Sequence, residues 1–396
     1  MNNILVKSAV VCFSILAFTQ TATARVFDEI IIFGDSLSDS GAYIGNADAG
    51  NGGRFTTNPG PVWTETLGAF YGLDVISNNP NNPRTSPTGN NYAQGGAQVT
   101  SPIGIGQTIS PQNAIPIASQ ISNYLATSPA ANPNGLYTVW GGANDLFFNA
   151  GQVGGGLAIP NAVDNMIASA FSLVGQVQRL SDAGAGTILV PNLPDVGNTP
   201  SVILKAISTV GAGNPNLNLA LGTATVVLRT PANTPAEQSG VEAAAISAAE
   251  AALGIPAGFL SPAVGQTSAL FTGLADAYNA GLEHFLSTTA NTILLDVNSL
   301  FGDVISDPSA FGISNVTSTA CNTPSSLNCT APFFASPNAA DEFLFADGVH
   351  PTTAGHTALA TYAISTVEAT SVPEPSVLFL LGPVFGFLAA RRRKAA

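Results

Sequence analysis

The chain has 396 residues, of which 45% are hydrophobic and 9% are charged, so it is long enough to bury a full core and too apolar for a disordered polar chain. Its formal net charge is −13, and the body between the two ends is more acidic: it keeps six of the eleven basic side chains and all of the 24 acidic ones except Glu374, or about −17. Such a body repels phosphate backbones and anionic head groups, which argues against nucleic acid as a partner.

Residues 1–24 have the order of a secretory signal peptide. Lys7 precedes an apolar run, 9–18, and the small residues Ala22-Thr23-Ala24 follow it. This order predicts export and cleavage by signal peptidase after Ala24. Cys12 would leave with the signal, and Val11 before it argues against a lipoprotein signal, which requires a small residue there.

Four short apolar runs in the body predict buried parallel strands, because each is compact and is followed at once by polar, Gly or Pro residues. Segments with helical patterns alternate with them, which favours an α/β layered domain over residues 25–371. The four runs are 29–33, 137–140, 187–190 and 292–295.

Two stretches carry apolar residues at helical spacing, from Val163 to Leu180 and from Leu270 to Phe285. Both stripes, the first including Ile167, predict faces packed on the core. Between them, residues 199–262 contain an Ala-rich helical segment, Glu242 to Leu253, flanked by loops rich in Gly, Pro and Asn. We interpret 199–262 as an insertion, and its role as a cap over a substrate cleft stays open.

Ser36 follows the first predicted strand directly, within Phe33-Gly34-Asp35-Ser36-Leu37-Ser38-Asp39. A hydroxyl on a turn at the carboxyl end of a parallel strand lies where open α/β sheets bind ligands. By itself, however, Gly-Asp-Ser after a strand is typical of a turn or a helix cap. A functional role for Ser36 therefore depends on partners elsewhere in the chain.

Histidine is scarce, so a general base has few candidates: His284, His350 and His356. His350 stands three residues after Asp347 on a loop that carries Gly and Pro. At this spacing the carboxylate can reach back to the imidazole, fix its tautomer and leave Nε2 free to accept a proton. The alternative is an ordinary loop Asp beside a partly exposed His. His284 and His356 fall in helical patterns and are expected to be surface or packing residues.

Two further segments offer hydrogen-bond donors. Residues 91–97 contain the pair Gly95-Gly96, whose backbone can approach a substrate closely, and the Asn144 amide follows the second predicted strand. Backbone N–H groups together with an Asn amide suffice for an oxyanion hole. Each segment alone is common loop chemistry, whereas the combination with Ser36 and His350, in this order, is informative.

The mature chain keeps two cysteines, Cys321 and Cys329. In an oxidising compartment they are predicted to close a small disulfide loop. Two free thiols are the alternative. No His is near them in sequence, which argues against a metal site.

Four segments of the chain, 33–39, 91–97, 142–145 and 347–352, resemble in this order the blocks of the GDSL family of lipases and esterases, also called SGNH hydrolases. The resemblance covers nearly the whole body. It implies a three-layer, flavodoxin-like α/β fold with a parallel central sheet flanked by helices, and no metal or organic cofactor. The Gly-x-Ser-x-Gly elbow of α/β-hydrolases is absent around Ser36, which disfavours that other fold.

The resemblance also implies the roles of individual residues. Ser36 would be the nucleophile, His350 the general base and then acid, and Asp347 the carboxylate that orients it. Three further acidic residues are expected to hold turns through side-chain hydrogen bonds: Asp35, Asp39 and Asp145. The implied oxyanion donors are the backbone N–H groups of Ser36 and Gly96 and the side chain of Asn144, with Gly95 as the alternative to Gly96.

The sequence thus predicts hydrolysis of a carboxylic ester through an acyl-enzyme. Three alternatives stay open: an O-acetylesterase of extracellular polysaccharide, acyl transfer to or from lipids, and a non-catalytic matrix protein with a degenerate site. The shape of the substrate does not follow from the sequence. We expect loops such as 45–61 and 99–111 to form the pocket walls.

The C-terminus, 372–396, reads Val372-Pro373-Glu374-Pro375, then an apolar run, 377–390, then Arg391-Arg392-Arg393-Lys394. About fourteen apolar residues are short for a membrane span, which needs roughly twenty. The segment resembles the PEP-CTERM sorting tail of Gram-negative bacteria. That resemblance implies transient membrane insertion, removal by an exosortase-type enzyme and delivery to the outer surface or extracellular matrix, and a plain membrane anchor is the alternative.

Overall fold

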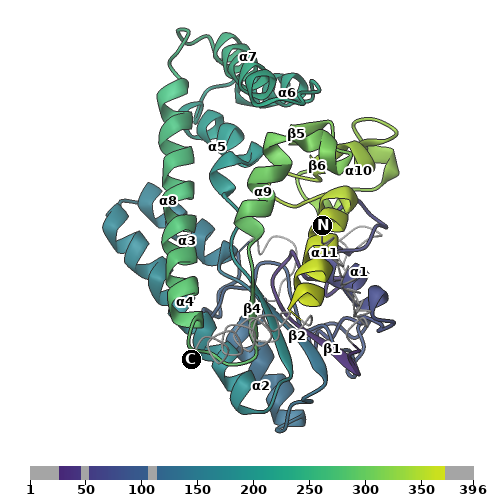
Figure 1. Cartoon of the computed structure of the whole chain (residues 1–396). Coiled ribbons are helices and arrows are strands. Elements are labelled where there is room, and N and C mark those ends of the chain that lie inside the picture. Colours follow the sequence, from purple (N-terminus) through teal and green to yellow (C-terminus); the bar gives the residue numbers. More distant parts are fainter. Residues whose placement is uncertain (1–25, 46–52, 106–113, 371–396) are drawn as a thin grey trace, which may run out of the picture. The chain divides into compact units, whose positions relative to one another are not determined.

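Four parallel strands form the central sheet (Figure 1). They are β1 (Glu29–Gly34), β2 (Gly135–Trp140), β3 (Thr187–Pro191) and β4 (Thr292–Leu295), in this order across the sheet. Each lies within two residues of its predicted ends, so the four predicted strands are confirmed. The first three are buried along almost their whole length, which is why they appear in the sequence as unbroken apolar runs.

The computed structural model describes residues 26–45, 53–105 and 114–370, and the signal peptide and sorting tail predicted above lie outside the described residues. The chain divides into two units, and the unit Val26–Val367 contains the central sheet and the residues predicted to form the site. No helix of the described part has the length and apolarity that a bilayer crossing needs.

The short segment 90–92 pairs with β1 on the side away from β2 and so extends the sheet. The Ile32 N–H donates to the Asn90 carbonyl at 2.9 Å, and the Tyr92 N–H donates to the Ile32 carbonyl at 2.8 Å. This segment comes second along the chain but lies outside the first strand, which is the strand order of flavodoxin-like sheets. In such sheets ligands bind where the winding direction changes, beside the carboxyl end of β1.

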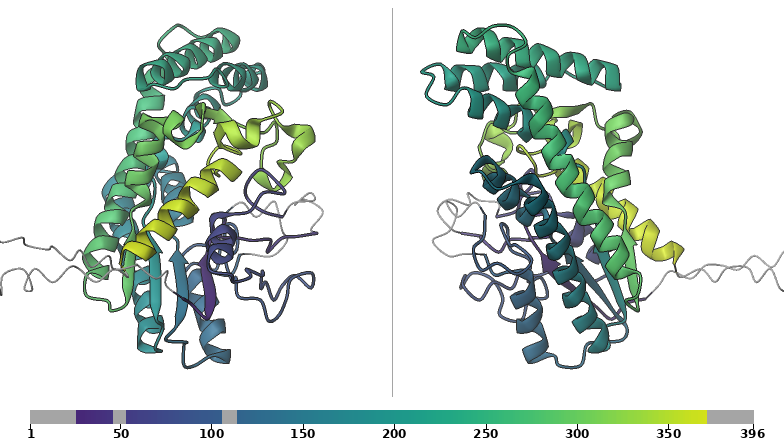
Figure 2. Two further views of the ribbon diagram at one scale, coloured as in Figure 1. Left: turned by 45° about the vertical axis from the view of Figure 1, so that its right-hand side comes forward. Right: turned by 90° about the vertical axis from the view of Figure 1, so that its left-hand side faces the viewer.

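Helices cover both faces of the sheet (Figures 1 and 2). One face packs on α2 (Ile117–Thr127), α4 (Ile159–Asp182) and α8 (Ser261–Leu286), and the other on α1 (Trp63–Phe70) and α11 (Thr353–Ala369). The three-layer α/β fold expected from the sequence is therefore confirmed.

The two predicted helical stripes lie on α4 and α8, where they face the sheet. One member of the first stripe was placed wrongly. Ile167 is 38% exposed, because it follows the fully buried Met166 and so points about 100° away from it around the helix.

The segment 199–262 is helical and has a hydrophobic cluster of its own. Its helices are α5 (Pro200–Val210), α6 (Leu217–Leu228) and α7 (Pro235–Leu253), which contains the predicted 242–253 helix. A capping box of Thr234 and Glu237 starts α7, and Gly254 ends it in the left-handed conformation. The α5 end of the segment contacts the loop after β6 (Phe343–Phe345), where the Ser201 N–H donates to the Gly348 carbonyl at 3.1 Å.

The remaining elements follow the sheet strands or surround β6. A second, two-stranded parallel sheet pairs β5 (Asn315–Thr319) with β6. Cys321 and Cys329 form a disulfide beside it, as the sequence predicts. The other helices are α3 (Ala143–Gly154), α9 (Val297–Ser306) and α10 (Ala339–Glu342), and the short 3-10 turns are η3 (Val196–Asn198), η4 (Pro308–Phe311), η5 (Ser326–Asn328) and η6 (Ala331–Phe333).

Candidate active site

Ser36 lies on a tight turn directly after β1. The Asp35 carboxylate shapes this turn by accepting a hydrogen bond from the Leu37 N–H at 3.1 Å, and the Asp35 carbonyl accepts one from the Ser38 N–H at 3.1 Å. Ser36 is 7% exposed and lines a pocket at the carboxyl end of the sheet. The predicted position of the hydroxyl, at the end of a parallel strand and facing a ligand site, agrees with this geometry.

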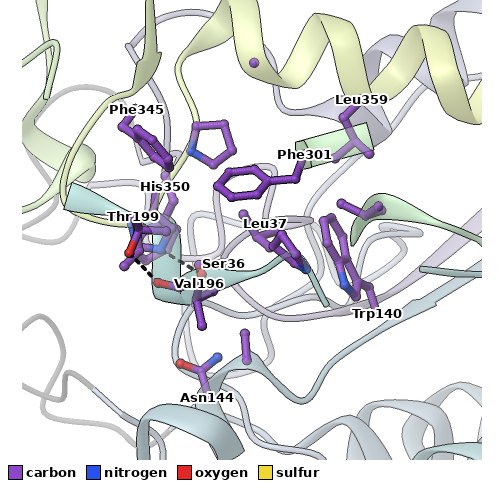
Figure 3. Close-up of a pocket in the computed structure, with 18 of the residues that line it drawn as sticks. Ser36, Leu37, Trp140, Asn144, Val196, Thr199, Phe301, Phe345, His350 and Leu359 are labelled. Atoms are coloured by element: carbon purple, nitrogen blue, oxygen red, sulfur yellow. Dashed lines mark hydrogen bonds between the residues drawn. The ribbon is translucent and has the colours of Figure 1, made fainter. Parts of the chain in front are cut away.

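His350 and Asp347 come from the loop between β6 and α11, more than 300 residues from Ser36 in sequence. The Ser36 Oγ is 2.9 Å from His350 Nε2 (Figure 3). On the other side of the ring, Nδ1 is 2.8 Å from Asp347 Oδ2 and 2.9 Å from Oδ1. The structure thus brings the three predicted residues into one chain of hydrogen bonds, with the carboxylate holding Nδ1 and leaving Nε2 facing the hydroxyl.

Asp347 is buried and accepts three backbone hydrogen bonds. Its donors are the N–H groups of Ser326 at 2.7 Å, His350 at 2.9 Å and Val349 at 3.1 Å. Burial alone would raise the pKa of this carboxyl, but the facing His350 and these hydrogen bonds lower it well below its ordinary value. Asp347 is therefore a fixed negative charge under the imidazole ring.

The same contact acts on His350 in the opposite direction. Burial would lower the pKa of the imidazole, but the Asp347 carboxylate outweighs it and raises that pKa above 6.5. The Phe55 ring packs against the imidazole with centroids 4.9 Å apart, which fixes the plane of the ring from another side. Sequence reasoning gave neither Ser326 nor Phe55 a role beside His350, because a backbone N–H and a loop Phe have no pattern of their own.

Gly95 and Gly96 differ in whether the backbone N–H has an acceptor. The Gly95 N–H donates to Asp39 Oδ2 at 2.9 Å, so this donor is occupied. The N–H groups of Gly96 and Ser36 donate to no acceptor among the described residues. Gly96 has φ +85°, and a Cβ there would lie 2.3 Å from the Ile105 carbonyl oxygen, so only glycine presents its N–H in this way. The geometry favours Gly96 over Gly95 as the free donor.

Asn144 stands in the first turn of α3, directly after β2. Gly142 leads into the helix with φ +106°, and a Cβ on it would meet the Tyr278 ring at 2.4 Å. The Asn144 Nδ2 donates to the Ala97 carbonyl at 3.0 Å and makes one longer contact, 3.4 Å, with Asp35 Oδ2. One amide hydrogen is thus anchored, and the other remains weakly held beside the pocket that Asn144 lines.

Asp35 and Asp39 hold turns as expected, whereas Asp145 instead joins separate segments of the chain. Asp39 accepts from the N–H groups of Gly41 and Ala42 as well as Gly95, and Asp145 accepts from the Val99 N–H at 3.0 Å and the Ser169 hydroxyl at 2.9 Å. Burial raises the pKa of both carboxyls to about 6 and that of Asp35 to about 7.

The other two histidines do not line the pocket. His356 on α11 is 1% exposed, and its Nδ1 accepts a hydrogen bond from the Trp63 N–H at 3.2 Å. Burial lowers its pKa to about 3, so it packs as a neutral ring. His284 is exposed at the end of α8 and contacts the Phe285 ring. Both are the packing or surface residues that the sequence predicts.

The pocket beside Ser36 has a volume of about 240 Å³ and an almost wholly apolar wall. Phe55 and Ile105 come from the loops expected to form it. About a third of the lining residues, however, come from two helices and a strand that sequence reasoning did not connect with the site: α9, α11 and β6. Of the insertion 199–262, Thr199 is the residue that contributes to the lining. Among the described residues, no three His, Cys, Asp or Glu side chains cluster as a metal site would require.

The fold and site together define a doubly wound α/β protein with a Ser–His–Asp hydrogen-bonded chain at the carboxyl edge of its sheet. The sequence model of the GDSL-like lipase/acylhydrolase family matches residues 30–363, and the chain belongs to this family.

Three relatives show how the family is represented. Lipase 1 of Photorhabdus luminescens is 27% identical over 374 residues, which cover 89% of this chain and 52% of the lipase. Esterase EstA of Pseudomonas aeruginosa is 27% identical over 386 residues, covering 89% of this chain and 49% of the esterase. An acetylesterase of Thermothelomyces thermophilus is 29% identical over 204 residues, covering 48% of this chain and 64% of that protein. The chain thus spans about half the length of the first two.

Proposed function

We propose that the protein is a serine esterase that hydrolyses carboxylic esters through a covalent acyl-enzyme on Ser36. The observation that supports this most directly is the continuous contact from Asp347 through His350 to the Ser36 hydroxyl, with distances of 2.8 and 2.9 Å. The names of the relatives, lipase, esterase and acetylesterase, agree with this class of reaction.

The proposed reaction has two steps. The Ser36 Oγ attacks the ester carbonyl carbon while its proton passes to His350 Nε2, and the carbonyl oxygen becomes an oxyanion. When the tetrahedral intermediate collapses, the C–O bond to the alcohol breaks and His350 returns the proton to the leaving oxygen. Water then attacks the acyl-enzyme with His350 as base, which releases the acid and restores Ser36.

In this proposal three donors bind the oxyanion: the N–H groups of Ser36 and Gly96 and the Asn144 amide. The two backbone donors have no other acceptor in the described part of the chain, and the amide gives up only a 3.4 Å contact with Asp35. Donors that have no partner before the reaction and point at the oxygen where negative charge develops stabilise the transition state more than the ground state.

A covalent probe tests the proposal directly. A fluorophosphonate should label the purified protein at Ser36, located by peptide mass spectrometry, and short p-nitrophenyl esters should be hydrolysed. A protein that is neither labelled nor active on any ester would instead be a binding or matrix protein with a degenerate site.

We also propose that the enzyme acts outside the cell. The support is the order of segments at the two ends of the sequence, residues 1–24 and 372–396. Mass spectrometry of the protein recovered from its native host should find a mature chain that begins at Arg25 and lacks the basic end, 391–394. An intact C-terminus in a membrane fraction would favour a plain anchor instead.

A further inference from the structure

We propose that the pocket beside Ser36 continues into a channel between α9 and α11 that holds an unbranched hydrocarbon chain of the ester. The proposal rests on the esterase function above and adds its substrate class. We call this part of the pocket the α9–α11 channel and define it by its wall residues: Val297, Leu300, Phe301, Val304, Phe345, Ala358 and Leu359.

The wall of the channel is a helical stripe on each side. Val297, Leu300, Phe301 and Val304 line the pocket from α9, at the spacing of one helix face, and Ala358 and Leu359 line it from α11. Figure 3 shows Phe301, Phe345 and Leu359 on one side of Ser36 and Asn144 on the other. A chain in the channel would therefore extend away from the oxyanion donors.

The polar groups of the pocket wall are already occupied within the protein. The Trp140 Nε1 donates to the Asn192 carbonyl at 3.1 Å, the Tyr43 hydroxyl to the Gly95 carbonyl at 2.7 Å, and the Thr199 hydroxyl to the Val196 carbonyl at 2.8 Å. Apart from Ser36, His350 and Asn144, the described residues of the wall thus offer no free side-chain donor.

This lining selects between the substrate classes that the sequence leaves open. A sugar ring placed here would lose its hydrogen bonds to water and find few replacements among the described residues, which is costly in an apolar site. A methylene chain gives up no hydrogen bonds. Burial of each methylene group should raise kcat/KM about fourfold. The channel therefore favours an alkyl chain over an acetylated polysaccharide.

The length of the wall sets the length of the chain. From Val297 to Val304 the α9 stripe rises about 10 Å, at 1.5 Å per residue. An extended chain advances about 1.2 Å per bond, so about eight carbons match this wall. We expect kcat/KM to rise from two-carbon to about eight-carbon esters and then to level off or fall.

The test fills the channel from α11. In Ala358→Phe a ring enters the channel, whereas Thr357→Phe adds the same ring one residue earlier, at an exposed position. With p-nitrophenyl esters from acetate to dodecanoate, Ala358→Phe should lower the octanoate-to-acetate ratio of kcat/KM at least tenfold, and Thr357→Phe should leave it within twofold. An unchanged ratio in an Ala358→Phe protein that still hydrolyses acetate contradicts the channel.

Two further arms complete the experiment. A parallel series of alkyl acetates assigns the channel: a loss confined to p-nitrophenyl acyl esters places the acid chain there, and one confined to alkyl acetates places the alcohol chain there. If Ala358→Phe does not fold, Val304→Ala widens the channel instead and should move the preferred length to longer chains, and no movement counts against the proposal. A wild-type protein that hydrolyses no ester refutes the esterase function itself rather than the channel.

A separate observation concerns the disulfide. We infer that the loop closed by Cys321 and Cys329 positions Asp347 for the proposed reaction. The Ser326 N–H on this loop donates the shortest of the three backbone hydrogen bonds to the carboxylate, 2.7 Å. At the start of the loop the Cys321 N–H donates to the Ala346 carbonyl, next to Asp347, at 3.2 Å.

The other side of the loop is fixed by Asn58. The Asn58 Nδ2 donates to the Ser326 carbonyl at 2.9 Å, and the Asn58 N–H donates to the Cys329 carbonyl at 2.7 Å. Leu327 is buried in a cluster with Phe55, the residue whose ring packs on His350. Through these contacts the loop holds the carboxylate directly and the imidazole through Phe55.

Because both cysteines are buried, substitution is a cleaner test than a reductant. The double variant Cys321→Ser with Cys329→Ser should lower kcat about tenfold, the loss expected for a hydrogen bond to a charged group, with KM within twofold. Asn322→Ala, at an exposed position on the same loop, is the control and should keep the wild-type kcat. An unchanged kcat in the folded double variant overturns the inference.

If the double variant does not fold, Asn58→Ala replaces it. This variant removes the amide donor to the Ser326 carbonyl and leaves the disulfide in place. It should again lower kcat more than it raises KM, with the folded state checked by circular dichroism. A rise in KM alone, or no change, contradicts a positioning role, and loss of labelling in every variant together with the wild type points back to the esterase proposal.

Discussion

Replacing Ser36 with alanine should lower kcat by about four to six orders of magnitude and leave the fold intact. The proposed mechanism has no second nucleophile among the described residues: the other hydroxyls of the pocket wall, those of Tyr43 and Thr199, donate to the Gly95 and Val196 carbonyls. The substitution removes one oxygen from a turn that Asp35 shapes through its own hydrogen bonds. Turnover of p-nitrophenyl butyrate and thermal unfolding followed by circular dichroism measure the two effects.

Ser38→Ala is the control for this experiment. Ser38 lies on the same turn and is fully buried, but its Oγ accepts a hydrogen bond from the Trp63 Nε1 at 3.2 Å and has no contact with His350. The variant should lose stability, by about 1 kcal/mol for the lost hydrogen bond, and keep most of its activity. Hydrolysis at the wild-type rate by Ser36→Ala would falsify the assignment of the nucleophile.

The sequence predicted the strands and the polar residues that follow them because those signals are local. A buried parallel strand must be an unbroken apolar run, and residues at its carboxyl end lie at the ligand-binding edge wherever the rest of the chain goes. Ser36 and Asn144 follow β1 and β2 in this way. Asp347 and His350 are three residues apart, so their contact is also a local property.

The remaining parts of the site depend on tertiary contacts, which leave no local pattern. Leu300 and Phe301 on α9 have the spacing of any core-facing stripe, and only the structure shows that they face a pocket rather than a neighbouring helix. The choice between Gly95 and Gly96 depends on Asp39, more than 50 residues away, which occupies the Gly95 N–H. The support of Asp347 by Ser326 uses a backbone group, which every residue except proline has.

Asp347→Asn should lower kcat by about 10⁴, close to the loss of Ser36 itself. The carboxylate sits among three backbone N–H donors and the ring Nδ1, and an amide cannot accept from all four. Its NH₂ group would meet one of these donors or turn the imidazole into the other tautomer, with the proton on Nε2. A ring in that tautomer cannot take the proton from Ser36.

The pH dependence separates this role from a loss of structure. The proposed base is neutral His350, so kcat/KM of the wild type should fall as the pH drops through a value above 6.5, where the ring becomes charged. Burial raises the pKa of Asp35 to about 7, so Asp35 titrates in the same range and also acts on His350. The fall of kcat/KM at acid pH therefore reports the two coupled groups together. In Asp347→Asn the main charge that raises the pKa of His350 is gone, and the residual activity should persist to lower pH.

A control variant and one contrary result complete the test. Asp341→Asn, at an exposed position on α10, removes a carboxylate without touching the site and should change neither kcat nor the acid limb. Asp347→Asn with more than a tenth of the wild-type kcat, or with its acid limb unmoved, would mean that the 2.8 Å contact does not govern the imidazole. The hydrogen bond from Ser326 would then stabilise only the loop, because its effect on the reaction passes through Asp347.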